Sequence, residues 1–164
     1  MENIEILVRF ALVGAGATLV MDLWAAMLRA AFGLPSLDYA LVGRWVGHMR
    51  RGAFRHRSIA DAAPIGCEQG LGWGLHYATG VGFALIFAVW VGGDWLNRPD
   101  LPDALIFGGL TVLVPFLVMQ PAFGVGLAAS RTRAPWRARL RSLNAHLSFG
   151  LGLYLAAQML LRVA

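Results

Sequence analysis

The sequence contains no lysine, a single cysteine and few charged residues for its length. All 14 basic residues among the 164 are arginines, only 9 residues are acidic, and charged residues make up 14% of the chain. A soluble domain usually has about 25% charged residues, so this composition argues against a soluble protein. The lone Cys67 can form neither an internal disulfide nor a cysteine pair for a metal ion.

The chain instead contains long apolar stretches, and 58% of its residues are hydrophobic. A helix needs about 20 mostly apolar residues to cross a bilayer. Backbone groups in lipid must be satisfied within a helix or a closed barrel, and the period-2 alternation of a barrel is absent. We therefore predict an all-α fold, an integral membrane four-helix bundle forming a single domain over residues 1–164, with spans at about 7–31, 71–91, 103–129 and 143–161.

The third of these stretches contains two prolines, Pro115 and Pro121. Each proline removes one backbone hydrogen bond of an α-helix, so we expect this span to be kinked or locally unwound. Prolines are also tolerated in membrane helices when neighbouring groups satisfy the exposed carbonyls. The two prolines therefore predict a distorted helix, and they do not by themselves predict a cavity.

The arginines are concentrated in two of the three connections between the predicted spans. The connection between the second and third spans instead contains Asp94, Asp100 and Asp103 against Arg98 alone. Because arginine-rich loops stay on the cytoplasmic side, this asymmetry predicts that both arginine-rich loops are cytoplasmic and both termini periplasmic.

An amphipathic helix is predicted in the first cytoplasmic loop, over about residues 37–49, with Ser36 as its cap. Leu37, Leu41 and Trp45 share one face and Arg44 lies on the opposite face, which is typical of a helix at a membrane interface. Anionic lipid headgroups are the predicted partners of the loop arginines, and nucleic acid is not, because both loops are tethered to the bilayer. The residues predicted to contact lipid or a protein partner are Arg44, Arg50, Arg51, Arg55, Arg57, Arg131, Arg133 and Arg137.

Each predicted span carries one polar side chain at membrane depth: Asp22, His76, Gln120 and His146. A charged group at the centre of a membrane helix costs at least about 2.5 kcal/mol unless it is paired or hydrated, so such residues are candidates for a functional site. Counted from the cytoplasmic ends at 1.5 Å per residue, the four lie roughly 8–16 Å inside the boundary. Small neighbours one turn away predict that Asp22, His76 and His146 face the bundle interior.

Several chemistries are open to this predicted layer. Asp22, His76 and His146 together would suit a divalent metal such as Zn²⁺, Fe²⁺ or Mn²⁺, and the same groups could pass a proton. Two histidines could also hold haem, although both lie near one surface. The alternative, which the sequence favours equally, is a purely structural role in which these polar residues lock the helices together. Glu68, two turns before His76, is a candidate for a cytoplasmic mouth.

Three segments carry a resemblance that spans nearly the whole chain. They are Gly14–His48, which begins GAGATLVMDLW, then GWGLHYATG at 72–80, and Pro115–Leu155, which begins PFLVMQPAFGVG. They resemble short bacterial inner-membrane proteins catalogued as domain of unknown function 2938. The resemblance implies a bacterial inner-membrane protein of four helices, and it implies no activity, cofactor or residue role.

A small transporter or permeation protein is the function that these observations favour, with a proton or metal ion bound at the polar layer. Four helices leave little room for an enclosed path, so a homodimer is expected. The alternative is a non-catalytic scaffold or accessory subunit that docks a cytoplasmic partner through the arginine-rich loops. A redox or lipid-modifying enzyme is a third option, which the sequence favours less. No phosphate loop or hydrolase triad is present.

Overall fold

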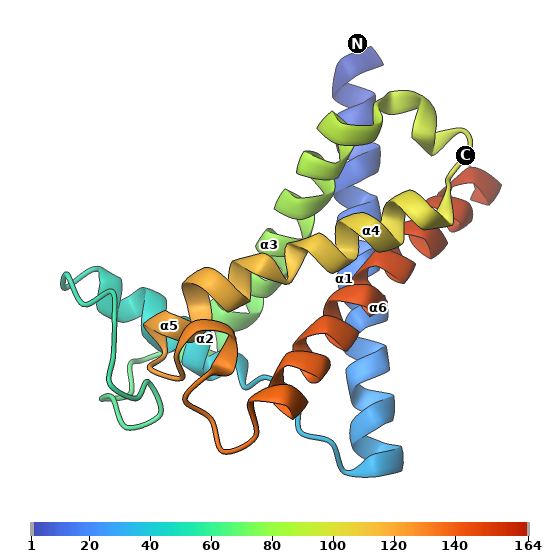
Figure 1. Cartoon of the computed structure of the whole chain (residues 1–164). Helices are drawn as coiled ribbons and strands as arrows, with labels where there is room; N and C mark the ends of the chain where they lie inside the picture. Colours follow the sequence, from blue (N-terminus) through green and yellow to red (C-terminus); the bar gives the residue numbers. More distant parts are fainter. Residues whose placement is uncertain (1, 164) are drawn as a thin grey trace. The chain divides into compact units, whose positions relative to one another are not determined.

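A computed structural model describes residues 2–163, and within that range every regular element is helical. The all-α prediction is therefore confirmed. The longer helices are α1 (Glu2–Phe32), α2 (Tyr39–Met49), α3 (Glu68–Val91), α4 (Leu101–Thr111) and α6 (Pro135–Val163). Short helical segments complete the fold: η1 (Gly93–Leu96), η2 (Pro115–Met119), α5 (Gln120–Ala122) and η3 (Leu127–Ala129), as Figure 1 shows along the chain.

The chain forms two compact units where a single domain was predicted. Unit 1 contains the described residues up to Ser36, Tyr77–Thr111, and those from Asn144 onward. Unit 2 contains Leu37–His76 and Val112–Leu143. Because α3 and α6 each contribute residues to both units, the side chains of one helix take part in two separate sets of contacts.

Three helical stretches of the described chain are long and apolar enough to cross a membrane: Ile4–Phe32, Glu68–Val91 and Leu101–Ala122. The first two agree with the predicted spans. The third ends at Ala122 and not at residue 129, because the chain turns after α5. The fourth predicted span lies within α6, whose Asn144, His146 and Gln158 lower its hydropathy, so four spans are not confirmed.

The predicted distortion of the third span is present as a π-helix, η2. Pro115 begins this segment, and the Gln120 N–H bonds to the Pro115 carbonyl five residues earlier. A π-turn of this kind widens a helix locally and is frequent at functional sites. The prediction of local unwinding is therefore confirmed, and Gln120 follows directly after it.

The core of unit 1 is aromatic and lies between α1, α3, α4 and α6 (Figure 1). Phe87 is fully buried, with ring centroids 4.8 Å from Trp95 and 5.0 Å from Phe107. Two glycines bring helices into close contact. A Cβ on Gly14 would lie 2.7 Å from Ala84 of α3, and one on Gly108 would lie 2.5 Å from Gly150 of α6.

Unit 2 has its own small core, which includes α2. Ile59, Ala122 and Phe123 are buried and pack against Leu41 and Trp45. The apolar face that predicted an interfacial helix therefore makes contacts inside the protein. A helix is present over Tyr39–Met49, with a different cap, and its predicted interfacial character is not confirmed.

The cap of α2 is Asp38 and not Ser36 as predicted. The Asp38 carboxylate accepts a hydrogen bond from the Ala40 N–H at 3.0 Å. The Ser36 hydroxyl instead accepts a hydrogen bond from Arg29 of α1. An Asp two positions closer to the helix can reach the first exposed N–H groups, whereas Ser36 cannot.

Candidate functional site

Asp22 of α1 and Tyr77 of α3 form the first polar pair in unit 1. A hydrogen bond joins the two side chains, and both residues are half-buried within membrane-length helices. Thr18, one turn before Asp22, is 1% exposed, and a Cβ on Gly80 of α3 would fall 1.9 Å from its Oγ1. The stripe of α1 that carries Asp22 therefore faces α3, as the small neighbours predicted.

His146 of α6 and Thr111 of α4 form the second pair. Their Nδ1 and Oγ1 atoms lie 2.7 Å apart, and the Thr111 hydroxyl donates to the Gly108 carbonyl at 2.6 Å. A hydroxyl has one hydrogen, so Thr111 accepts a hydrogen bond from His146 Nδ1–H. The Nδ1–H of His146 is therefore directed at Thr111.

The two pairs lie at neighbouring levels of unit 1, because α1 and α6 pack as antiparallel helices. Trp24 Nε1 donates to Asn144 Oδ1 at 2.7 Å, and a Cβ on Gly152 would lie 2.7 Å from the Ala17 carbonyl oxygen. Asp22 lies between positions 17 and 24, and His146 lies between positions 144 and 152. Unit 1 therefore carries a polar layer of Asp22, Tyr77, Thr111 and His146, which we call the acid–imidazole layer.

His76, predicted as a member of this layer, makes its described contacts inside unit 2. Its Nε2 lies 3.0 Å from the Tyr39 hydroxyl of α2, and the two rings stack with centroids 4.2 Å apart. The ring of Trp73 approaches the same histidine edge-on at 5.8 Å. In unit 1 the position on α3 next to Asp22 is occupied by Tyr77.

Sequence reasoning missed Tyr77, and the tertiary contacts of α3 show why it lies in the layer. Tyr77, Gly80 and Ala84 follow at helical spacing, and Gly80 and Ala84 are among the residues of α3 that contact α1. Tyr77 therefore belongs to the stripe that faces Asp22. His76 is one residue, or about 100°, away from that stripe.

Gln120, the fourth predicted polar residue, also lies in unit 2. It is 8% exposed and its amide donates to the Ser142 hydroxyl of α6 at 3.2 Å. Its Oε1 atom is buried and has no hydrogen-bond partner among the described residues. Gln120 therefore joins the π-helix to α6 within unit 2.

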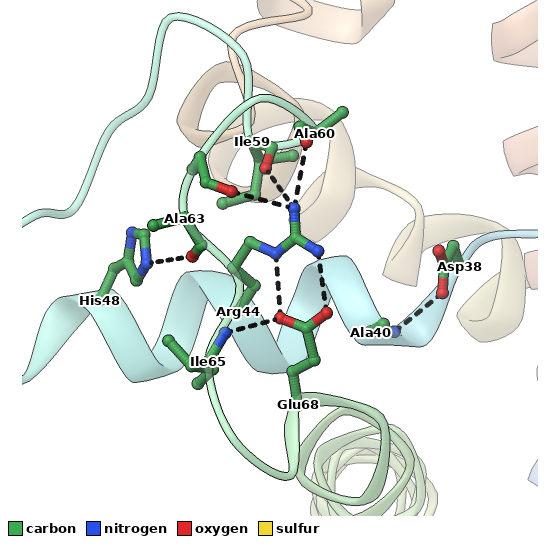
Figure 2. A network of polar contacts seen from close by, with 10 residues as sticks. Asp38, Ala40, Arg44, His48, Ile59, Ala60, Ala63, Ile65 and Glu68 are labelled. Atoms are coloured by element: carbon green, nitrogen blue, oxygen red, sulfur yellow. Dashed lines mark hydrogen bonds and ion pairs between the residues drawn. The ribbon is translucent and has the colours of Figure 1, made fainter.

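Glu68, predicted to guard a cytoplasmic mouth, forms an ion pair with Arg44 of α2 (Figure 2). Two hydrogen bonds of 2.9 and 2.8 Å join the carboxylate to the guanidinium, and the side chains of Arg44 and Glu68 are only 11% and 17% exposed. The Ile65 N–H also donates to Glu68 at 3.1 Å. Glu68 is thus held by internal contacts, whereas it was predicted to lie at an open cytoplasmic mouth.

Arg44, predicted to contact lipid, is an internal residue for the same reason. Besides Glu68, its guanidinium donates to three carbonyls of the loop between α2 and α3, at 3.1–3.3 Å. Figure 2 shows the guanidinium between that loop and the start of α3. The hydrogen bond to Glu68 raises the pKa of Arg44. The arginine of this ion pair therefore stays positively charged at physiological pH.

His48 and His56 form a second connection between α2 and this loop. His48 Nε2 donates to the Ala63 carbonyl at 2.9 Å, and His48 Nδ1 lies 2.9 Å from His56 Nε2. One nitrogen of that contact must donate and the other accept, so the two imidazoles cannot both be fully protonated while it persists. The loop is thus fixed to α2 at both Arg44 and His48.

The family described as protein of unknown function (DUF2938) matches this sequence over residues 11–160. The chain belongs to the DUF2938 family. This match confirms the resemblance and covers residues of both units. Neither the comparison with curated proteins nor the comparison with solved structures gave a match.

In this DUF2938 protein, the remaining predicted contact arginines are exposed: Arg50, Arg51, Arg55, Arg57, Arg131, Arg133 and Arg137. All of them lie in unit 2. Among the residues that the structure describes, no three His, Cys, Asp or Glu side chains gather into a group that could hold a metal ion. The acid–imidazole layer contains a carboxylate, an imidazole and two hydroxyls.

Proposed function

We propose that this DUF2938 protein moves protons across a membrane through the acid–imidazole layer. The observation that carries the proposal is the pairing of Asp22 with Tyr77 and of His146 with Thr111 at neighbouring levels of one apolar helical unit. A carboxylate and an imidazole are the side chains that take up and release protons most readily near neutral pH. Ionisable groups inside membrane helices are retained mainly where they form such relays.

The geometry supports a proton more than a larger solute. Thr111 orients the imidazole of His146 through the hydrogen bond from Nδ1–H. Tyr77 holds the Asp22 carboxylate in one orientation through a hydrogen bond. Two oriented groups at neighbouring levels could exchange a proton through intervening water.

The membrane arrangement is part of the proposal. We infer four spans, with α6 crossing beside the three more apolar helices, and both arginine-rich segments on the cytoplasmic side of a bacterial inner membrane. The exposed arginines of unit 2 support this orientation through the positive-inside rule. A homodimer would provide the further helices that a closed path through the bilayer needs.

Proton flux into proteoliposomes tests the proposal. Purified protein is reconstituted with a pH-sensitive dye inside the vesicles, and a potassium gradient with valinomycin supplies the driving potential. We expect Asp22→Asn to lower the flux to that of empty vesicles. Tyr77→Phe, which keeps the carboxylate, should lower it by about three- to tenfold, the range expected for losing one hydrogen bond.

Thr79→Val is the matched control, because Thr79 is exposed on the same helix two residues from Tyr77. This variant should keep wild-type flux. Each variant is first checked by circular dichroism and gel filtration in detergent. Wild-type flux in a folded Asp22→Asn protein, or wild-type flux no higher than that of empty vesicles, would refute the proposal.

The exposure of Arg131, Arg133 and Arg137 favours a second candidate function, a scaffold that docks an acidic cytoplasmic protein. Neutralising these three arginines would then release a co-purified partner and leave helical content unchanged. Retention of the same partners by the triple variant would count against docking.

A further inference from the structure

We propose that unit 2 contains a binding pocket for a phosphate group, formed where its two arginine-rich segments meet. An open pocket of about 400 Å³ is lined by Arg55 from the first segment and by Ser130 and Arg131 from the second. The two arginines are 76 residues apart in the sequence, so no linear motif shows them as a pair. This proposal does not depend on proton movement in unit 1.

Backbone hydrogen bonds fix the first segment against the second. The His56 N–H donates to the Ala122 carbonyl at 2.8 Å, and the Ile59 N–H donates to the Phe123 carbonyl at 3.1 Å. A Cβ on Gly124 would fall 2.1 Å from the Arg57 carbonyl oxygen, so the two backbones touch there. Arg55 is therefore held beside the turn that carries Arg131.

That turn, which lines the pocket, has an unusual backbone. Gly126 has φ +81°, and a Cβ there would lie 2.4 Å from Ser130 Oγ and 2.8 Å from Arg131 Cγ. Two residues that are not glycine, Ala128 and Ala129, also adopt left-handed conformations with φ 45° and 59°. Strain of this kind persists where the surrounding contacts enforce it, and it is concentrated at binding sites.

Further contacts hold the turn in this form. The Arg131 N–H donates to the Val125 carbonyl at 2.9 Å, and Arg139 of α6 donates to the Ala128 carbonyl at 2.8 Å. The left-handed alanines are thus tied to α6. The side chains of Ser130 and Arg131 remain exposed at the pocket.

The chemistry of the lining matches phosphate. Two guanidinium groups supply planar, forked donors and two positive charges, and Ser130 adds a hydroxyl. None of the residues that line this pocket is acidic. A phosphate monoester carries up to two negative charges and offers three oxygens, so it uses both arginines at once. The phosphate could belong to a lipid headgroup such as phosphatidate or to a free phosphate ion.

Binding measurements on the full-length protein in detergent test the proposal. The probes are dioleoylphosphatidate, counted as bound lipid by native mass spectrometry, and inorganic phosphate, titrated by calorimetry. We expect the double variant Arg55→Gln/Arg131→Gln to weaken binding of at least one probe by about tenfold or more, as expected for the loss of two charge-assisted contacts. Binding of phosphatidate alone would identify a lipid headgroup as the source, and binding of both would identify free phosphate as sufficient.

Arg133→Gln/Arg137→Gln is the matched control, because both residues are exposed in the same segment and neither lines the pocket. It removes the same charge and should change binding by less than about threefold, as expected for general electrostatic attraction to anions. Equal weakening by both double variants, or no binding of either probe by the wild type, would overturn the proposal. If the Arg55→Gln/Arg131→Gln protein does not fold, Arg131→Lys takes its place in the experiment, because lysine keeps the charge and lacks the forked donors. Unchanged binding by Arg131→Lys would also overturn the forked contact.

Discussion

Three of the polar side chains that the sequence singles out are each held by a hydroxyl group. Tyr77 holds Asp22, Thr111 holds His146, and Tyr39 holds His76. These partners come from other helices, so each contact also joins two elements. Removing a partner therefore affects both the stability of a helix pair and the orientation of an ionisable group.

Tyr77→Phe should destabilise the protein because it removes the hydrogen bond to Asp22. Hydrogen bonds to charged groups contribute about 1.5–3 kcal/mol, and we expect a loss in that range. The measurement is reversible unfolding in mixed micelles, followed by circular dichroism. Thr79→Val on the same helix should change stability by less than about 0.5 kcal/mol. A Tyr77→Phe protein as stable as the control would contradict the pairing.

Of the four polar residues that the sequence singles out, Asp22 and His146 lie in unit 1, whereas His76 and Gln120 lie in unit 2. Asp22 and His146 are ionisable residues in apolar stretches, which any hydropathy argument selects. His76 and Tyr77 are adjacent, and Gly80 lies one turn after either of them, so small neighbours could not decide between their two faces. The Ala84 contact with Gly14 decides it, and that contact is a tertiary one.

At the scale of elements, close contacts at glycines set the distance between neighbouring helices. In unit 2, a Cβ on Gly72 of α3 would lie 1.8 Å from the Tyr39 carbonyl oxygen, and one on Gly43 of α2 would lie 1.9 Å from the Glu68 carbonyl oxygen. Both contacts are to backbone, which cannot move aside. The first turns of α3 therefore cross α2, and the two backbones are in contact there.

Gly72→Ala should consequently separate α2 from α3 and destabilise unit 2 by several kcal/mol, as expected when overpacking meets a rigid backbone. Gly74 is the matched control, because a Cβ there would have no neighbour within 4 Å. In a helix Ala is favoured over Gly by up to about 1 kcal/mol, so Gly74→Ala should be neutral or stabilising. Equal stability of the two variants, measured by unfolding in micelles, would contradict the close crossing.

The loop between α2 and α3 depends on Arg44. Arg44→Gln removes the ion pair with Glu68, so we expect the loop to open more often. Chymotrypsin cleavage after Phe54, which is 60% exposed, measures this opening. Cleavage should be at least about tenfold faster than in the wild type, since local opening governs proteolysis.

Arg50→Gln provides the control for this experiment, because Arg50 is exposed on the same loop and lies outside the network in Figure 2. Its cleavage rate should equal that of the wild type. Equal rates in both variants would show that Arg44 does not hold the loop. Sequence reasoning assigned Arg44 to lipid because its partner, Glu68, is 24 residues away and belongs to a different helix.

At the scale of the whole molecule, hydropathy predicted three of the helical stretches well. The third stretch was drawn too long, because apolar residues continue past Ala122 while the backbone turns. The division into two units could not be predicted, since it depends on which face of α3 and α6 meets which neighbour. The pocket between Arg55 and Arg131 could not be predicted either, because the two residues are far apart in the sequence.

Cys67 offers a direct test of the proposed orientation, because it is exposed and is the one cysteine in the sequence. We expect a membrane-impermeant maleimide to label it in inverted inner-membrane vesicles and not in intact cells. A Cys67→Ser protein gives the background. Labelling in intact cells would place the arginine-rich segments outside and contradict the positive-inside assignment.

Infrared difference spectroscopy on a pH step tests the central claim most directly, because it detects protonation of a single carboxyl group. The account predicts a carboxylic C=O band on acidification that is absent in Asp22→Asn and shifted in Tyr77→Phe, since the tyrosine hydroxyl bonds to that carboxylate. Thr79→Val should leave the band unchanged. Identical difference spectra for the wild type and Asp22→Asn would contradict the account.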